Sequence, residues 1–386
     1  MSDILIFAAV FISLAVGWGV GRYQGLFQLN NLTKPIQPLS SKYFKGLNYL
    51  INEEPDQAIH HFITMLEDDS ESVDLQIILA KLFRKQGELD RAITVHQRLL
   101  ARPDLSDEVR QKVHVELAQD YYSGGLHDRA EQLLLEAHSH EESESVQELL
   151  FSLWEEQQEW QQVLDLAKGL KHLSPKLSLR VVGACCKLSV SFKSDSYSYL
   201  NFAEKFQPDS VMLHYHFAEA HLQAGNSRKA LKRLKRLITL DQAMAPVALP
   251  LLKQCFKGRG VWFNSYREVL EDWYQLNPSI SIASELVQLI MVDEGKDAAL
   301  IFLTEYLKIR PSIPGLVQLV DLHLKSDTQQ DQATMKMFRN LCRQIIEERH
   351  KFQCQKCGYL ANQMYWQCPN CRKWESIRPV FGLEAK

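Results

Sequence analysis

The pattern of hydrophobic and polar residues divides the chain into three parts. An uninterrupted apolar stretch opens the sequence, amphipathic segments with a recurring spacing fill the middle, and two pairs of cysteines lie close to the end. From these changes in pattern we expect a membrane anchor at 1–21, a linker at 22–37, a helical array at 38–350 and a metal-binding domain at 351–386.

The apolar stretch covers residues 4–21, which include no charged side chain. As a helix these residues would span about 27 Å, close to the hydrocarbon thickness of a bilayer, about 30 Å. A cleaved signal peptide would need a positively charged start, whereas Asp3 makes this one acidic. Arg22 and the lysines downstream of it indicate that the rest of the chain lies in the cytoplasm. The pattern therefore predicts an uncleaved, single-pass anchor with the bulk of the chain on the cytoplasmic side.

Within this stretch, Gly17 and Gly21 form a Gly-x-x-x-Gly pair. Such a pair lets two membrane helices approach closely, which would make a homodimer through the anchor. Glycine is also common in membrane helices in general, so both interpretations stay open.

Small residues recur through the middle of the chain, with 34 residues between Ala58 and Ala92. Three of the four polar turns that precede a repeated alanine contain glycine. The alanines are Ala58, Ala92, Ala130 and Ala230; the small residues twelve positions earlier are Gly46, Ala80, Ala118 and Ala218; and the ring-bearing residues three positions after these are Tyr49, Phe83, Tyr121 and His221. Small residues let two helix backbones approach, and the ring fills the groove between neighbouring units. The pattern resembles the tetratricopeptide repeat, which has a period of about 34 residues and two antiparallel helices per unit.

Four further units are more degenerate. A proline stands twelve residues after the position equivalent to the repeated alanine, where it would end the second helix of the unit. These prolines are Pro175, Pro208, Pro278 and Pro311. Together the two sets predict about eight units between residues 38 and 312. Tryptophans replace smaller residues in the degenerate units, so we expect irregular packing around Trp154, Trp160, Trp262 and Trp273.

Composition and motifs exclude several functional classes. The apolar fraction of 46% and charged fraction of 24% are ordinary for a globular protein, and a net charge of −3 gives no electrostatic case for nucleic-acid binding. The sequence contains no Walker A loop, no Gly-x-Ser-x-Gly elbow and no His-Glu-x-x-His, so we expect a binding protein rather than an enzyme. The basic run at 228–236 is interpreted as the solvated outer face of a helix, with an acidic partner surface or anionic lipid as the alternatives.

The end of the chain carries the strongest chemical signal. Two Cys-x-x-Cys pairs supply four candidate ligands, Cys354, Cys357, Cys368 and Cys371. This spacing is typical of a tetrathiolate site for one iron or zinc ion, between which the sequence does not choose. The pairs resemble the knuckles of rubredoxin and related zinc ribbons. A structural or regulatory metal is the preferred interpretation, with an electron carrier and a nucleic-acid ribbon as alternatives. The other four cysteines, Cys185, Cys186, Cys255 and Cys342, are expected to be small buried residues.

The metal-binding tail is too short to fold by burying apolar surface alone, so metal ligation should supply part of its stability. We expect a miniature core of aromatic residues, namely Phe352, Tyr359, Tyr365, Trp366 and Trp374. Five aromatics exceed what so small an interior can hold. The tail should therefore also lie against the last helices of the array, or against a partner, and complete a binding surface.

The anchor, the array of eight or nine repeat units and the C-terminal knuckle domain, in this order, resemble the lipopolysaccharide assembly protein B family of Gram-negative bacteria. The most specific matches are the segments 43–50 and 55–59 and the four C-terminal cysteines. The resemblance implies an all-α fold: a tetratricopeptide-repeat superhelix with an N-terminal transmembrane helix and a small rubredoxin-like knuckle domain.

The same resemblance implies a function. Members of the family are adaptors at the bacterial inner membrane that promote degradation of the lipid A pathway deacetylase by the membrane AAA+ protease FtsH. The expected partners are therefore FtsH, the deacetylase and other lipopolysaccharide assembly proteins, with no nucleic acid. The alternative is a redox protein that uses an iron–tetrathiolate centre.

Overall fold

The computed structural model describes residues 41–52, 54–68, 72–140, 143–170, 172–257, 262–324, 332–347 and 349–380. The predicted anchor and linker lie outside these residues. Among the helices that the structure describes, none is both long enough and apolar enough to cross a membrane.

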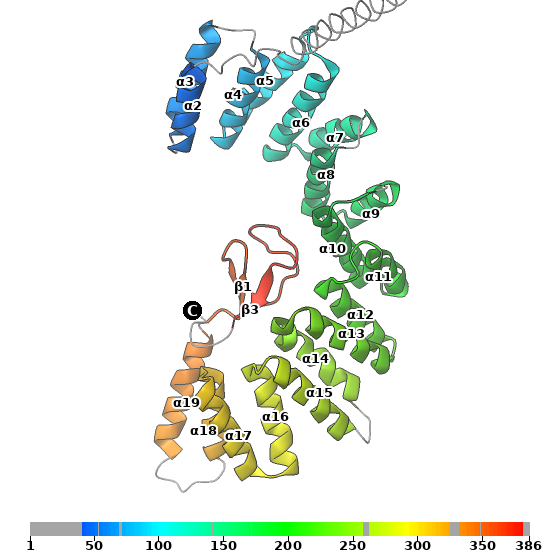
Figure 1. The fold of residues 1–386 in the computed structure, drawn as a ribbon, viewed down its shortest axis with the longest axis vertical. Coiled ribbons are helices and arrows are strands. Elements are labelled where there is room, and N and C mark those ends of the chain that lie inside the picture. Colours follow the sequence, from blue (N-terminus) through cyan, green and yellow to red (C-terminus); the bar gives the residue numbers. More distant parts are fainter. Residues whose placement is uncertain are drawn as a thin grey trace, which may run out of the picture. The chain divides into compact units, whose positions relative to one another are not determined.

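The chain forms two compact units, one up to Val146 and one from Gln147 to Lys386. Each consists mainly of helices that follow one another as antiparallel hairpins (Figure 1). The helices of the first unit are α2 (Ser41–Ile51), α3 (Pro55–Asp68), α4 (Val73–Lys85), α5 (Leu89–Leu100), α6 (Asp107–Ser123) and α7 (His127–His140).

The second unit contains the remaining helices and a small sheet. Its helices are α8 (Glu144–Gln157), α9 (Trp160–Gly169), α10 (Pro175–Ser191), α11 (Ser196–Glu204), α12 (Val211–Gln223), α13 (Ser227–Leu240), α14 (Ala245–Phe256), α15 (Trp262–Leu276), α16 (Ile280–Asp293), α17 (Lys296–Ile309), α18 (Ile313–Leu324) and α19 (Gln332–Glu347). The short 3-10 helices η1 (Lys193–Asp195) and η2 (Gln242–Met244) connect some of them.

The small residues that define the repeat lie where the helices of a hairpin touch. Every alanine of the predicted pattern is fully buried, namely Ala58, Ala80, Ala92, Ala118, Ala130, Ala218 and Ala230. Gly46 shows why the position must be small, because a β-carbon there would lie 2.5 Å from the ring of Phe62. Phe83 and Tyr121 are buried as well. The predicted tetratricopeptide-like packing is confirmed.

The degenerate units also follow the predicted plan. Helices α9, α11, α15 and α17 each end shortly before one of the four prolines, which then precede or begin the next helix. The hairpin α18–α19 continues the array beyond residue 312, in agreement with the upper estimate of nine units. Trp154 and Trp273 are buried in their units. The basic run forms part of α13, where all its cations except the half-buried Arg233 are exposed, as expected for an outer face.

The chain closes with a three-stranded antiparallel sheet in the order β2-β1-β3. The strands are β1 (Phe352–Cys354), β2 (Leu360–Ala361) and β3 (Ile377–Pro379). Phe352 pairs with Ala361 on one side, and Cys354 pairs with Ile377 on the other. This register places the first cysteine of the metal-binding pattern at the end of the central strand.

Candidate metal centre and its docking surface

The two Cys-x-x-Cys pairs fold into matching turns. In the first, the amide of Gly358 donates to the carbonyl of Cys354 at 3.0 Å; in the second, the amide of Arg372 donates to the carbonyl of Cys368 at 2.9 Å. Gly358 and Arg372, each directly after the second cysteine of its pair, have positive φ angles of 76° and 56°. Such a backbone suits glycine and costs a side-chain-bearing residue some strain. The repeated turn aims the cysteine side chains of both pairs at one point.

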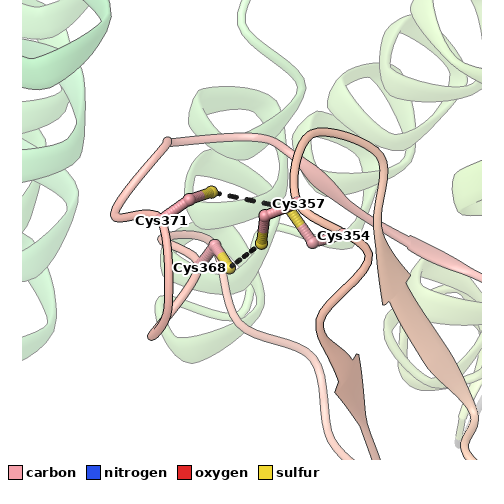
Figure 2. Close-up of side chains that lie close together, drawn as sticks. All are labelled: Cys354, Cys357, Cys368 and Cys371. Carbon is pink, nitrogen blue, oxygen red and sulfur yellow. Dashed lines mark hydrogen bonds between the residues drawn. The ribbon is translucent and has the colours of Figure 1, made fainter. Parts of the chain in front are cut away.

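All four sulfur atoms lie within 4.8 Å of one another (Figure 2). The Sγ atoms of Cys354 and Cys371 are 3.7 Å apart, as are those of Cys357 and Cys368. A tetrahedral tetrathiolate with zinc–sulfur bonds of about 2.3 Å has sulfur–sulfur edges of about 3.8 Å. The four cysteines therefore fit one metal ion, and they form a cluster that could hold one.

The surroundings of the sulfurs affect their ionisation differently. Burial opposes ionisation of Cys354, but contacts with Ser376 and with backbone amides outweigh it and lower the pKa of this thiol to about 6. At Cys368 burial prevails and raises the pKa to about 12. A bound cation would favour the thiolate at every position. The amide of Lys356 also donates to Cys354 Sγ at 3.4 Å, as expected where a turn supports a thiolate.

The cysteines of the array are different. Cys185, Cys186, Cys255 and Cys342 are all buried, as predicted. Burial raises the pKa of Cys185 to about 12 and that of Cys186 well above its usual value. Thiols that are held protonated in an apolar interior are poor nucleophiles and ligands. They are packing residues.

The metal domain docks on the helices of the second unit through Trp374. This buried side chain lies so close to α10 that a β-carbon at Gly183 would be 2.6 Å from its indole ring. The indole nitrogen donates to Oε1 of the buried Glu155 at 3.2 Å, and Trp160 meets the ring edge-on. Arg180 donates to the same carboxylate at 2.8 Å, so the buried charge of Glu155 is balanced.

The residue after Trp374 makes a second contact with the array. Glu375 Oε1 accepts hydrogen bonds from the amide of Met212 at 2.7 Å and from the hydroxyl of Ser210 at 2.6 Å. Ser210 is the N-cap of α12, and its hydroxyl also accepts from the amide of Leu213. A carboxylate at this end of a helix meets unpaired amides and the positive end of the helix dipole. The metal domain thus contributes a cap to a helix of the array.

Further contacts surround these two. Trp366 lies 5.3 Å from Tyr215, between ring centroids, and packs against the core around α12 to α16. Gln367 donates to Glu155 at 2.9 Å, and Arg372 to Glu156 at 3.0 Å. On the sheet side, Arg378 pairs with Asp241.

Two expectations about the tail need correction. The polar and aromatic contacts described above lie on α8, α9, α10, α12 and beside η2, in the middle of the array, whereas the sequence pointed to its last helices or to a partner. Among the described residues, the last helices meet only the sheet side of the tail, where Phe352 lines a pocket with Ile313 and Ile346. Only Phe352, Tyr359 and Tyr365 of the five aromatics pack around the cysteines. Trp366 and Trp374 pack against the array, because the small domain leaves no interior for two indoles.

A cavity of about 650 Å³ lies between the docked metal domain and the array. The array contributes Trp160, Lys187 and Tyr215 to its lining, among others, and the metal domain contributes Trp366 and Trp374. Neither part encloses this space alone. The docked domain therefore adds one wall of a pocket on the repeat surface.

Sequence reasoning did not find Glu155, Gly183, Ser210 or Glu375. Each belongs to a residue type that is common in any helix or turn, and the contacting partners are more than 160 residues apart. One signal was present: Trp154 and Trp160 mark an irregular unit, and this unit supplies the acceptor and the aromatic partner of Trp374.

Comparison with known proteins agrees with this architecture. The family described as rubredoxin metal binding domain matches residues 352–379, and the tetratricopeptide repeat family matches residues 45–107. Lipopolysaccharide assembly protein B of Escherichia coli (strain K12) is 27% identical over 390 residues, covering 99% of either chain. Over nearly its full length the chain is similar to lipopolysaccharide assembly protein B.

A second relative with this name, from Haemophilus influenzae, is also 27% identical, over 98% of this chain and 99% of its own. Among solved structures, the tetratricopeptide-repeat protein YrrB matches 50% of this chain and 96% of its own, with 16% identity and a TM-score of 0.35. The match to lipopolysaccharide assembly protein B includes both the repeat array and the knuckle domain.

Proposed function

We propose that the protein is a membrane-tethered cytoplasmic adaptor that modulates lipopolysaccharide biosynthesis. In this proposal it promotes FtsH-dependent proteolysis of the lipid A pathway deacetylase. The name of its homologues supports a role in lipopolysaccharide assembly, and an array of helical hairpins supports a role in binding other proteins. No step of this role requires a reactive centre in the adaptor itself.

The observation that carries the proposal is the cavity shared by the array and the docked metal domain. Aromatic side chains converge there with charged ones, including Lys187 and Arg372. Concave sites of this kind, lined by aromatic groups and a few placed polar groups, are the usual binding places on a protein surface. A partner segment bound there would contact both domains at once. Its recognition would then depend on the docked state.

The proposed metal site is Cys354, Cys357, Cys368 and Cys371, with one iron or zinc ion. When bound, the ion supplies coordination energy that holds the two turns together. The residues of the chain do the rest: the turns orient the four thiolates, and the folded domain presents Trp374 and Glu375 to the array. The metal thus acts on binding through structure rather than through chemistry.

The proposed arrangement in the cell follows from the predicted anchor. Residues 1–21 would span the bacterial inner membrane once, with a linker at 22–37, the array at 38–350 and the metal domain at 351–386 in the cytoplasm. Tethering raises the local concentration of an adaptor near a membrane-bound protease without any new contact.

Site-directed photo-crosslinking in membranes tests the proposal. A photoreactive residue at Lys187, which is exposed at the cavity, should capture FtsH or the deacetylase. The same residue at Lys232, exposed on the outer face of α13, is the matched control and should capture neither. Removing residues 1–21 should weaken the capture at Lys187. Equal capture at both positions, or capture of neither protein at Lys187, would contradict the proposal.

A further inference from the structure

The last helix of the array carries an uncovered apolar stripe. Met337, Phe338, Leu341 and Ile345 of α19 expose 66%, 46%, 49% and 42% of their surfaces. At about 100° per residue these four side chains fall within an arc of about 100° on the helix. They form one contiguous surface, which we call the α19 stripe.

The α19 stripe differs from the other exposed apolar residues in the described parts of the second unit. Val292 and Ile309, for example, are more exposed, but they lie on separate helices. The end of a repeat array normally has a polar outer face, because no further unit covers it. After α19 the chain enters the sheet of the metal domain instead of another helix. The stripe therefore lies where the next helix of an array would pack.

A different face of α19, away from the stripe, packs against α18. Cys342 is buried in that contact, and Arg339 and Arg343 both pair with Asp321 of α18. The exposed residues beside the stripe, Asn340 and Gln344, are uncharged. A helix that lies on a lipid surface is rich in lysine and arginine on its polar face, where they contact anionic headgroups. Arg339 and Arg343 of α19 instead pair with Asp321 of α18, so a protein helix suits the stripe better than a membrane.

We infer that the α19 stripe binds the same stripe of a second copy of this chain, with the two helices antiparallel. Met337, Leu341 and Ile345 are spaced by four residues and form one ridge of the kind that packs between helices. A two-fold axis at Leu341 places Met337 of one copy beside Ile345 of the other, so apolar side chains meet apolar side chains. The neutral border lets two identical surfaces meet without repulsion between like charges.

The small size of the α19 stripe indicates under which conditions two copies of the chain associate. Four partly exposed side chains on each copy bury less than the roughly 1,200 Å² of a stable interface. The pair should therefore be weak in dilute solution and should form where copies are concentrated. The predicted membrane anchor provides such a concentration.

Thiol crosslinking of the full-length chain in membranes tests this inference. Leu341→Cys should give several-fold more crosslinked dimer than Lys336→Cys, because position 336 lies about 140° around the helix from position 341. The chain without an added cysteine gives the background from Cys357, which is exposed. When two differently tagged copies are mixed, Met337→Cys in one should crosslink with Ile345→Cys in the other, and Met337→Cys should not crosslink with itself.

A charged substitution in the α19 stripe provides a second test of the inferred dimer. Leu341→Asp should abolish co-purification of two differently tagged copies from membranes, whereas Lys336→Asp, about 140° around the helix, should leave it unchanged. Circular dichroism of both variants shows whether the array has kept its helices. The inference is overturned if the crosslinks at 341 and 336 are equally weak, if Leu341→Cys crosslinks to a different protein instead, or if folded Leu341→Asp copies still co-purify.

Discussion

Gly183 and Trp374 lie in such close contact that the helix and the indole leave no space for a single additional methyl group. The β-carbon of an alanine at 183 would be 2.6 Å from the ring. Trp374 also donates to Glu155, so movement of the ring breaks a buried hydrogen bond. The fit between the repeat array and the metal domain depends on this contact.

Gly183→Ala should weaken docking. Overpacking of this kind typically costs about 1–3 kcal/mol, more than the gain of up to about 1 kcal/mol that alanine brings to an open helix position. Thermal unfolding and protease cleavage of the metal domain would measure the loss. Gly169→Ala, at the end of α9, is the matched control because no atom lies within 4 Å of the added carbon. If Gly183→Ala resists protease as well as Gly169→Ala does, docking of the metal domain does not depend on the contact between Gly183 and Trp374.

Glu375→Ala should destabilise the N-terminus of α12. The change leaves the Met212 amide and the buried Ser210 hydroxyl without their acceptor, which costs about 1–3 kcal/mol. Glu375→Gln keeps an acceptor and loses the charge, so it should cost less, about 0.5–1 kcal/mol. Hydrogen exchange at the Met212 amide is the direct measurement. Unchanged exchange in Glu375→Ala would show that α12 does not need this cap.

Cys357→Ser should remove the metal and unfold the C-terminal domain while the helices remain. One ligand fewer opens the coordination shell, and the array has a core of its own. Metal analysis and far-ultraviolet circular dichroism test this together, and the absorption of the wild-type protein distinguishes coloured iron–thiolate from silent zinc. Cys185→Ser is the control: it should disturb the array core and keep the metal. A Cys357→Ser protein with a full metal content would contradict the ligand set.

The sequence predicted the parts of the fold that depend on local spacing. Ala58 and Ala92 were recognisable because hairpin packing demands small residues at the same places in each unit, and the four cysteines because their turns fix the intervals. Docking depends on a different kind of information. Nothing near Gly183 or Glu375 reveals that its partner lies far along the chain, since a glycine in a helix and a glutamate after a tryptophan have many roles.

Acid should destabilise the second unit through His214. Burial, and then the charge of Arg233, lower the pKa of this imidazole to about 4. The unfolded chain binds the proton at about pH 6.5 and the folded chain only at about pH 4, so stability falls as the pH drops through this range. His214→Gln removes this proton uptake. Urea unfolding at about pH 7 and about pH 4.5 should show a smaller loss for the variant than for the wild type. If the wild type and His214→Gln lose the same stability between these pH values, His214 is not the source of the acid sensitivity.

The lifetime of the lipid A pathway deacetylase in cells tests the central claim most directly, namely that an adaptor with a docked metal domain delivers it to FtsH. After protein synthesis is stopped, the deacetylase should decay quickly with the wild-type chain or Gly169→Ala, and slowly with Gly183→Ala at equal expression. Loss of FtsH should remove the difference. An unchanged lifetime with an undocked Gly183→Ala chain, or a difference that persists without FtsH, would contradict the account.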